Sequence, residues 1–241
     1  MLLRGVIFDL FHTLTGAESA WSHLPKTYEI LGISRSEWNK AVYDLSRWRL
    51  AGEVRDSTEI VRTLAHSIDP DVPEQLIIRA ASIRQQRSHT ALRSIPPENV
   101  CLLSRLRDRG IQLGLISNLD ASEFAGWAAS PLAGAFDAEL FSCEVGMAKP
   151  DTAIYVECLS RMGLRAHECI FVGDGGGNEF FGARQAGLYT VMFSGVIKEL
   201  WPERIATLEQ SADTHIRALS DLLSLPMVRD IVGVSNEPDA E

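Results

Sequence analysis

Long apolar runs are missing from this chain of 241 residues, and cysteines are few. No stretch reaches the roughly 18 uninterrupted apolar residues that a membrane span needs. Arg4 and Asp9 interrupt the apolar N-terminus, which has no small-residue cleavage pattern. The four cysteines are scattered without a CxxC pair, which argues against a disulfide framework and a zinc site. We expect a soluble, cytoplasmic protein without a membrane partner, whose cysteines are reduced core residues.

Basic residues are scarce relative to acidic ones. The chain has 23 Lys and Arg against 32 Asp and Glu, a formal net charge of −9. Such a chain repels a polyanion, so nucleic acid is not the expected partner. Apolar residues make up 46% of the sequence, enough for the core of one large or two small domains. The composition leaves the oligomeric state open.

Short apolar runs that alternate with helical patterns set the expected fold class. Helix signals include the capping pair Asp120 and Glu123 and a proline, Pro97, in a first turn. This alternation predicts an α/β protein with a Rossmannoid parallel sheet and helices on both faces. The predicted strands are 2–8, 111–116, 138–141, 169–172 and 189–193, and the predicted helices are 97–109, 120–129, 151–162 and 178–186.

Residues 16–95 break this alternation, because they show helical patterns and no convincing strand. Ser34 with Glu37 and Asp56 with Glu59 are helix-start signals. We therefore expect an inserted helical domain. The predicted organisation is a discontinuous core of residues 1–15 and 96–225, a helical domain of residues 16–95, and a flexible tail of residues 226–241.

Several arginines of this insertion have two interpretations. Solvated helix faces explain any single one of them best. A helical domain that faces an anionic substrate would explain them together. The residues concerned are Arg47, Arg49, Arg55, Arg79, Arg84 and Arg87.

Four polar clusters follow the predicted strands or the turns beside them. Because ligands bind at the carboxyl ends of parallel strands, residues placed there can converge on one site. Each cluster alone also has a structural explanation, as a strand end, a turn, a loop charge or a helix cap. The clusters are Asp9 in FDLFHTLT, Ser117 and Asn118 in LISNLD, Lys149 in GMAKPD, and Asp174 to Glu179 in GDGGGNE.

The residue types in these clusters suit one reaction. A carboxylate such as Asp9 can form a covalent intermediate that water later cleaves. Hydrogen-bond donors and the Lys149 ammonium can neutralise transferring oxygens. Asp9, Asp174 and Glu179 would repel one another without a cation, and oxygen-rich sites of this kind prefer Mg²⁺. These features predict a small anionic molecule as the substrate.

The ordered motifs resemble those of the haloacid dehalogenase (HAD) superfamily of hydrolases, and the helical insertion after the first motif resembles its C1-type cap. The similarity covers residues 1 to about 195. It implies Asp9 as nucleophile, Thr13 and Ser117 as phosphate-orienting hydroxyls, and Lys149 as the charge stabiliser. It also implies Mg²⁺ held by Asp9, Asp174, Glu179 and the backbone carbonyl of Phe11.

One position departs from the phosphatases of this superfamily. They carry a second aspartate two residues after the nucleophile, as general acid and base, where this chain has Phe11. Losing such a group typically costs ~10²–10⁴-fold in rate. The adjacent His12 can transfer protons near neutral pH, but a structural role is favoured. Phe11, His12 and Asn118 are the expected substrate-binding residues.

Three functions remain open from the sequence. The first is a Mg²⁺-dependent phosphatase-type hydrolase, weak or specialised because of Phe11. The second resembles the 2-haloacid dehalogenases, which carry an aromatic residue at this position and need no metal. The third is a non-catalytic binding protein of the same fold. The acids of GDGGGNE favour the first over the second.

Overall fold

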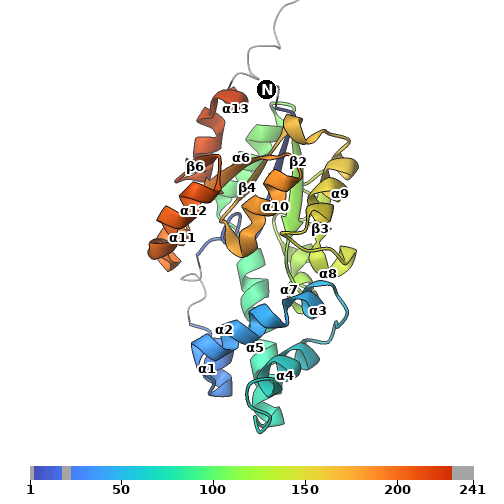
Figure 1. Ribbon diagram of the computed structural model, residues 1–241, viewed down its shortest axis with the longest axis vertical. Helices are drawn as coiled ribbons and strands as arrows, with labels where there is room; N and C mark the ends of the chain where they lie inside the picture. Colours follow the sequence, from blue (N-terminus) through green and yellow to red (C-terminus); the bar gives the residue numbers. More distant parts are fainter. Residues whose placement is uncertain (1–2, 18–22, 230–241) are drawn as a thin grey trace, which may run out of the picture.

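The computed structural model describes residues 3–17 and 23–229, and its centre is one parallel sheet (Figure 1). All strand pairs are parallel, in the order β3-β2-β1-β4-β5-β6. This confirms the predicted α/β fold class. The strands are β1 (Gly5–Phe8), β2 (Gln112–Ser117), β3 (Ala138–Phe141), β4 (Cys169–Gly173), β5 (Tyr189–Phe193) and β6 (Thr214–Ile216).

The sequence did not predict β6, which is only three residues long and pairs with β5 alone. Its sequence, THI, has a single large apolar side chain, so it carries almost no strand pattern. β1 begins at Gly5, so the predicted start at residue 2 was early, and residues 1–2 lie outside the described part of the chain.

Apolar side chains alternate between the two faces of the sheet and build a separate core on each. Val6 and Phe8 of β1 belong to one cluster, whereas Ile7 belongs to the other. The same alternation in β4 sends Phe171 to the second cluster. Because helices cover both faces, every β1 residue is buried, and the strand reads as a continuous apolar run.

Helices cover the sheet at positions that the sequence largely predicted. Helix α9 contacts β2 and β3, α10 contacts β4 and β5, and the two helices contact each other. Helix α6 contacts β2 and the 3-10 helix Leu219–Ser224. Residues 120–129 form only a four-residue helix and a 3-10 turn. The helices are α6 (Pro97–Arg107), α7 (Ala121–Phe124), α8 (Ser142–Val145), α9 (Thr152–Met162), α10 (Glu179–Gln185), α11 (Ile197–Leu200), α12 (Ile205–Ser211) and α13 (Pro226–Arg229).

The predicted flexible tail begins too early. Residues Pro226–Arg229 form α13, whose Val228 is fully buried in the core, while residues 230–241 lie outside the described part of the chain.

The segment between β1 and α6 is helical and forms its own apolar cluster. Ser34 and Asp56 accept hydrogen bonds from the backbone N–H of Glu37 and Glu59, as the start signals predicted. In Figure 1 these helices lie together at the end of the molecule opposite α13. They are α1 (Thr27–Leu31), α2 (Arg35–Asp44), α3 (Ser46–Leu50), α4 (Ser57–His66) and α5 (Glu74–Arg93), and residues 18–22 lie outside the described part.

The cysteine prediction holds for three of four residues. Cys143, Cys158 and Cys169 are buried, but Cys101 is exposed on α6. The structure contradicts a core position for Cys101, because this residue lies on the solvent side of an amphipathic helix. Within the described ranges, no helix has both the length and the apolar character to cross a bilayer. The cytoplasmic location stays a prediction.

Candidate active site

Asp9 lies directly after β1 and is held from three sides. Its backbone N–H donates to the carbonyl of Val172 at 2.9 Å, which fixes the loop against β4. The Thr13 hydroxyl donates to Asp9 Oδ2 at 2.9 Å, and Lys149 Nζ donates to Asp9 Oδ1. Burial raises the pKa of Asp9, an effect that Lys149 opposes. The carboxylate is therefore oriented and desolvated, as a nucleophile requires.

Lys149 is buried with its ammonium group between two carboxylates. Nζ donates to Asp9 and, at 2.7 Å, to Glu179 Oε2. Burial alone would lower the pKa of Lys149, but Asp9 and Glu179 raise it above its ordinary value. The ammonium therefore stays charged. Asn118 fixes the lysine main chain: its Nδ2 donates to the Lys149 carbonyl at 2.7 Å, and its Oδ1 accepts from the Lys149 N–H at 2.8 Å.

Asp174 and Glu179 complete a group of three buried acids at the carboxyl edge of the sheet. One oxygen from each of Asp9, Asp174 and Glu179 lies within 4.8 Å of the others. Burial raises the pKa of Glu179 to about 8, and the neighbouring acids add to this effect. Burial also opposes ionisation of Asp174, but its contact with His12 lowers the pKa. We call these three acids with Lys149 the sheet-edge cluster.

The glycines of GDGGGNE let the backbone turn beneath these acids. Gly175 has φ +84°, a left-handed conformation that favours glycine. Its N–H donates to Glu179 Oε1 at 2.8 Å, and the N–H of Gly176 donates to Asp174 Oδ1 at 2.7 Å. The run of three glycines is therefore part of the site's construction.

The donor set of the sheet-edge cluster fits a hard divalent cation. Three carboxylates face one ammonium group, so the cluster has an excess of negative charge. Mg²⁺ prefers carboxylate oxygens and retains waters. Both oxygens of Glu179 already accept hydrogen bonds within the protein, so this residue also positions Lys149 and the glycine turn.

Ser117, at the end of β2, has a buried hydroxyl with no hydrogen-bond partner among the described residues. An unpartnered buried polar group costs free energy unless a ligand or water satisfies it. Its place at the same sheet edge as Asp9 fits a role in binding substrate oxygens.

Phe11, His12 and Asn118 line a cavity of ≈ 820 Å³ whose other walls come from the helical insertion, from Glu123 and from the segment 199–204 after β5. His12 has a left-handed backbone (φ +63°), uncommon outside glycine. Its Nδ1 lies 3.6 Å from Asp174 Oδ2, and its ring packs edge-on against Trp201 at a centroid distance of 5.1 Å. The structure thus brings all the predicted site residues to this sheet edge or to the adjoining cavity wall.

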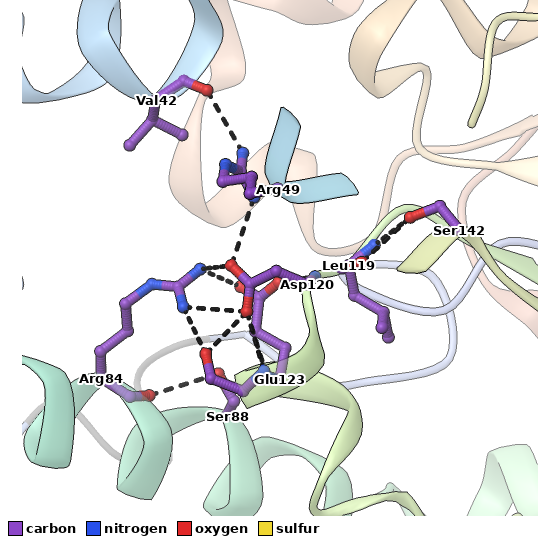
Figure 2. A network of polar contacts seen from close by, with 9 residues as sticks. Val42, Arg49, Arg84, Ser88, Leu119, Asp120, Glu123 and Ser142 are labelled. Carbon is purple, nitrogen blue, oxygen red and sulfur yellow. Dashed lines mark hydrogen bonds and ion pairs between the residues drawn. The ribbon is translucent and has the colours of Figure 1, made fainter. Parts of the chain in front are cut away.

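A second buried charge network joins the helical insertion to the sheet (Figure 2). Arg84 of α5 donates to both Asp120 oxygens, at 3.2 and 2.8 Å, and to Glu123 at 2.8 Å. Arg49 of α3 lies 3.5 Å from Asp120. These contacts lower the pKa of Asp120 to about 2 although burial opposes this. We call Arg49, Arg84, Asp120 and Glu123 the junction network.

Sequence reasoning missed the junction network. The signal for Asp120 and Glu123 predicted a capping box, which α7 indeed has. The same carboxylates also bind arginines 36 and more positions earlier in the chain, and a local pattern carries no information about such a pairing.

Comparison with known proteins shows the family of this chain. The sequence matches the haloacid dehalogenase-like hydrolases over residues 3–187, so the chain belongs to this family of hydrolases. It is 28% identical to a glyceraldehyde 3-phosphate phosphatase of Methanopyrus kandleri over about half of each chain (49% and 52%). It is 23% identical to the enzyme of that name from Methanocaldococcus jannaschii, over 93% of this chain and 97% of the relative.

Among solved structures, the L-2-haloacid dehalogenase of Xanthobacter autotrophicus is similar, with a TM-score of 0.64 and 18% identity. The match covers 97% of this chain and all of the dehalogenase. At this identity the likeness shows the fold alone, so it does not decide between dehalogenation and phosphate ester hydrolysis.

Proposed function

We propose that the protein is a Mg²⁺-dependent phosphohydrolase that acts on small phosphate esters through Asp9. The observation that carries the proposal is the buried Asp9 carboxylate held by Thr13 and Lys149, beside two further acids and the unpartnered hydroxyl of Ser117. The full-length relative from M. jannaschii, named a glyceraldehyde 3-phosphate phosphatase, supports this substrate class.

In the proposed reaction, an Asp9 oxygen attacks the phosphorus atom. A bond forms between Asp9 Oδ and phosphorus while the ester P–O bond breaks, and the leaving oxygen takes up a proton from solvent water because Phe11 cannot donate one. Water then attacks the aspartyl phosphate, which releases phosphate and restores the carboxylate. Lys149, Ser117 and Thr13 bind and orient the phosphoryl oxygens, and Lys149 offsets their charge.

Bound Mg²⁺ would neutralise charge on the phosphoryl group and on the carboxylates. The residues proposed to hold it are Asp9, Asp174 and Glu179 through their side chains and Phe11 through its backbone carbonyl. Helices α1 to α5 are proposed to act as the cap over this site, because residues of α1, α2, α3 and α5 line the cavity beside it.

Asp9→Asn tests the covalent route. We expect at least a ~10³-fold loss of p-nitrophenyl phosphate hydrolysis in the presence of Mg²⁺, because an amide is a poor nucleophile. The control is Asp71→Asn, an exposed aspartate in the insertion. Retained turnover in Asp9→Asn, with circular dichroism equal to the wild type, would contradict the mechanism.

Phe11→Asp tests the missing general acid. Phe11 lines the cavity two residues after Asp9, so an aspartate introduced there is proposed to protonate the leaving oxygen. We expect kcat for a poor leaving group, such as glycerol 3-phosphate, to rise up to ~10²-fold. The gain should be smaller for p-nitrophenyl phosphate, whose phenolate leaves without an acid. Equal or absent gains with both esters would show that proton donation does not limit the rate.

One observation favours a second candidate function. An aromatic residue at position 11 is also a feature of 2-haloacid dehalogenases, which the sequence resembles there. Halide release from 2-chloropropionate without Mg²⁺ would support dehalogenation over phosphate ester hydrolysis. If neither substrate type is turned over but Mg²⁺ binds, the result would support a non-catalytic binding protein.

A further inference from the structure

Aromatic side chains from the sheet domain gather at the cavity beside the sheet-edge cluster. Phe11 and His12 come from the loop after β1, and Trp201 comes from the segment between β5 and β6. All three residues line the cavity and are partly exposed. We call them the aromatic wall. Because none of them belongs to the helical insertion, the fold that places Asp9 also places the aromatic wall.

Contacts within the sheet domain hold the aromatic wall in place. The His12 ring packs edge-on against Trp201, at a centroid distance of 5.1 Å and an interplanar angle of 82°. The N–H of Trp201 donates to the carbonyl of the fully buried Ile197, and the Arg204 guanidinium lies over the Trp201 ring. The N–H of His12 donates to Thr15 Oγ1 at 2.9 Å. Rings held in this way bind a ligand at a small cost in conformational entropy.

Phe11 restricts the leaving group of the reaction as well as the lining of the cavity. A phenyl ring donates no proton, and general acid catalysis is typically worth ~10²–10⁴-fold in rate. An alkyl ester must release a strongly basic alkoxide, so it bears this loss in full. A phenolate is the conjugate base of a group with a pKa of ~10, as in tyrosine, and it can leave before it takes up a proton from water. The site therefore suits an ester with a phenolic leaving group.

We propose that the substrate is an aryl phosphate, in which the ring of the leaving group packs against Trp201 and Phe11. This inference rests on the proposed function of the sheet-edge cluster. Two separate observations support the same class. The missing proton donor favours a phenolate, and the aromatic wall provides rings against which an aryl group packs edge-on or offset. The cavity volume of ≈ 820 Å³ lies within the ~300–1,000 Å³ typical of small-molecule sites.

The bond changes follow those of the proposed reaction. Asp9 Oδ bonds to phosphorus while the P–O bond to the aryl group breaks, and its electron pair stays on the phenolate oxygen. The phenolate takes up a proton from water, and another water cleaves the aspartyl phosphate to release inorganic phosphate and restore Asp9. The leaving group takes part in the first step alone, so its effect is measured by kcat/KM and not by kcat.

Binding to the Asp9→Asn protein tests the aromatic contact apart from catalysis. Isothermal titration with Mg²⁺ would compare phenyl phosphate with cyclohexyl phosphate, two esters of similar size of which only the first is aromatic. We expect phenyl phosphate to bind at least ~3-fold more tightly, because aromatic pairs gain free energy beyond the area that they bury. Adding Trp201→Leu should remove this preference, whereas Trp201→Phe should retain most of it. Tyr43→Leu is the control, an exposed aromatic residue outside the cavity.

Hydrolysis of the same two esters tests the leaving group. With Mg²⁺ present, we expect the wild-type kcat/KM for phenyl phosphate to exceed that for cyclohexyl phosphate by at least ~10²-fold. Phe11→Asp should narrow this ratio at least ~10-fold, because an introduced acid assists departure of the alkoxide far more than departure of the phenolate. Phe11→Leu is the matched control, since it removes the ring without adding an acid and should change the ratio less than ~3-fold.

The outcomes distinguish this inference from the proposed function. Equal binding of the two esters, or a preference that survives Trp201→Leu, would overturn the aryl class even if the wild type hydrolyses cyclohexyl phosphate and is thus a phosphatase. A ratio of kcat/KM below ~10² would overturn it in the same way. Binding of phenyl phosphate that depends on Trp201, in a wild-type protein that hydrolyses neither ester, would support aryl recognition and overturn the proposed function.

Discussion

The sheet-edge cluster and the junction network are both buried groups of charges, but their charge balance differs. The junction network has two arginines for two acids, and Arg84 bonds both oxygens of Asp120 (Figure 2). The sheet-edge cluster has three acids for one lysine and lies beside the unpartnered Ser117 hydroxyl. The junction network has equal numbers of acidic and basic side chains, whereas the sheet-edge cluster has an excess of acids.

Under the proposed function, this difference separates a structural charge network from a functional one. A balanced ion network joins α3 and α5 to the start of α7 without need of a ligand. Burial raises the pKa of Glu179 to about 8, and the neighbouring Asp9 and Asp174 add to this effect, so keeping Glu179 charged in the protein interior costs free energy. A cation or an anionic substrate with its cation would remove that cost. Stability measurements can therefore test the comparison directly.

Breaking the balance of the junction network should have the largest effect. Asp120→Asn keeps a helix-capping side chain at the start of α7 but leaves Arg84 and Arg49 buried without their main counter-charge. We expect a loss of about 3–5 kcal/mol in the free energy of unfolding, measured with urea. The matched control is Asp56→Asn, also a helix cap, with an expected change below ~0.5 kcal/mol. Equal losses would assign the effect to capping.

Filling the sheet-edge cluster with a cation should stabilise the protein by a smaller amount. At a Mg²⁺ concentration 100 times its Kd, the free energy of unfolding should rise by about 2.7 kcal/mol. Asp174→Asn should abolish most of this gain, because it removes one carboxylate of the group. Asp120→Asn should retain the gain despite its lower stability. An equal Mg²⁺ response in Asp174→Asn and the wild type would place the ion elsewhere.

Nearly all of the sheet-edge cluster could be predicted from the sequence. Asp9 and Asp174 directly follow β1 and β4, which read as apolar runs, and parallel strands bring their carboxyl ends to one edge. Ser117, the last residue of β2, lies at the same edge. The chemistry of those residues then limits the types of reaction that the site could catalyse. This part was predictable because strand direction alone determines which residues meet.

The junction network and the cavity wall formed by the insertion were not predictable in the same way. Their geometry depends on the orientation of α3 and α5 about their own axes and on where these helices approach the sheet. Apolar periodicity does not determine either feature precisely enough to place a single side chain. The arginines of the insertion suggested an anionic substrate as a group, yet Arg84 bonds Asp120 whereas Arg87 lines the cavity wall and bonds the Leu24 carbonyl. Only the packed structure separates these two roles.

Ser117→Ala should have the smallest effect on stability and, unlike Asp120→Asn, should stabilise the protein. Removing a buried hydroxyl that has no partner among the described residues should raise the free energy of unfolding by up to about 1 kcal/mol, while kcat/KM for a phosphate ester falls at least ~10-fold. Ser122→Ala is the matched control, because that hydroxyl bonds Asp120 and Arg84 and its loss should destabilise the protein. A destabilised Ser117→Ala protein would make Ser117 a structural residue and remove the contrast between the two groups.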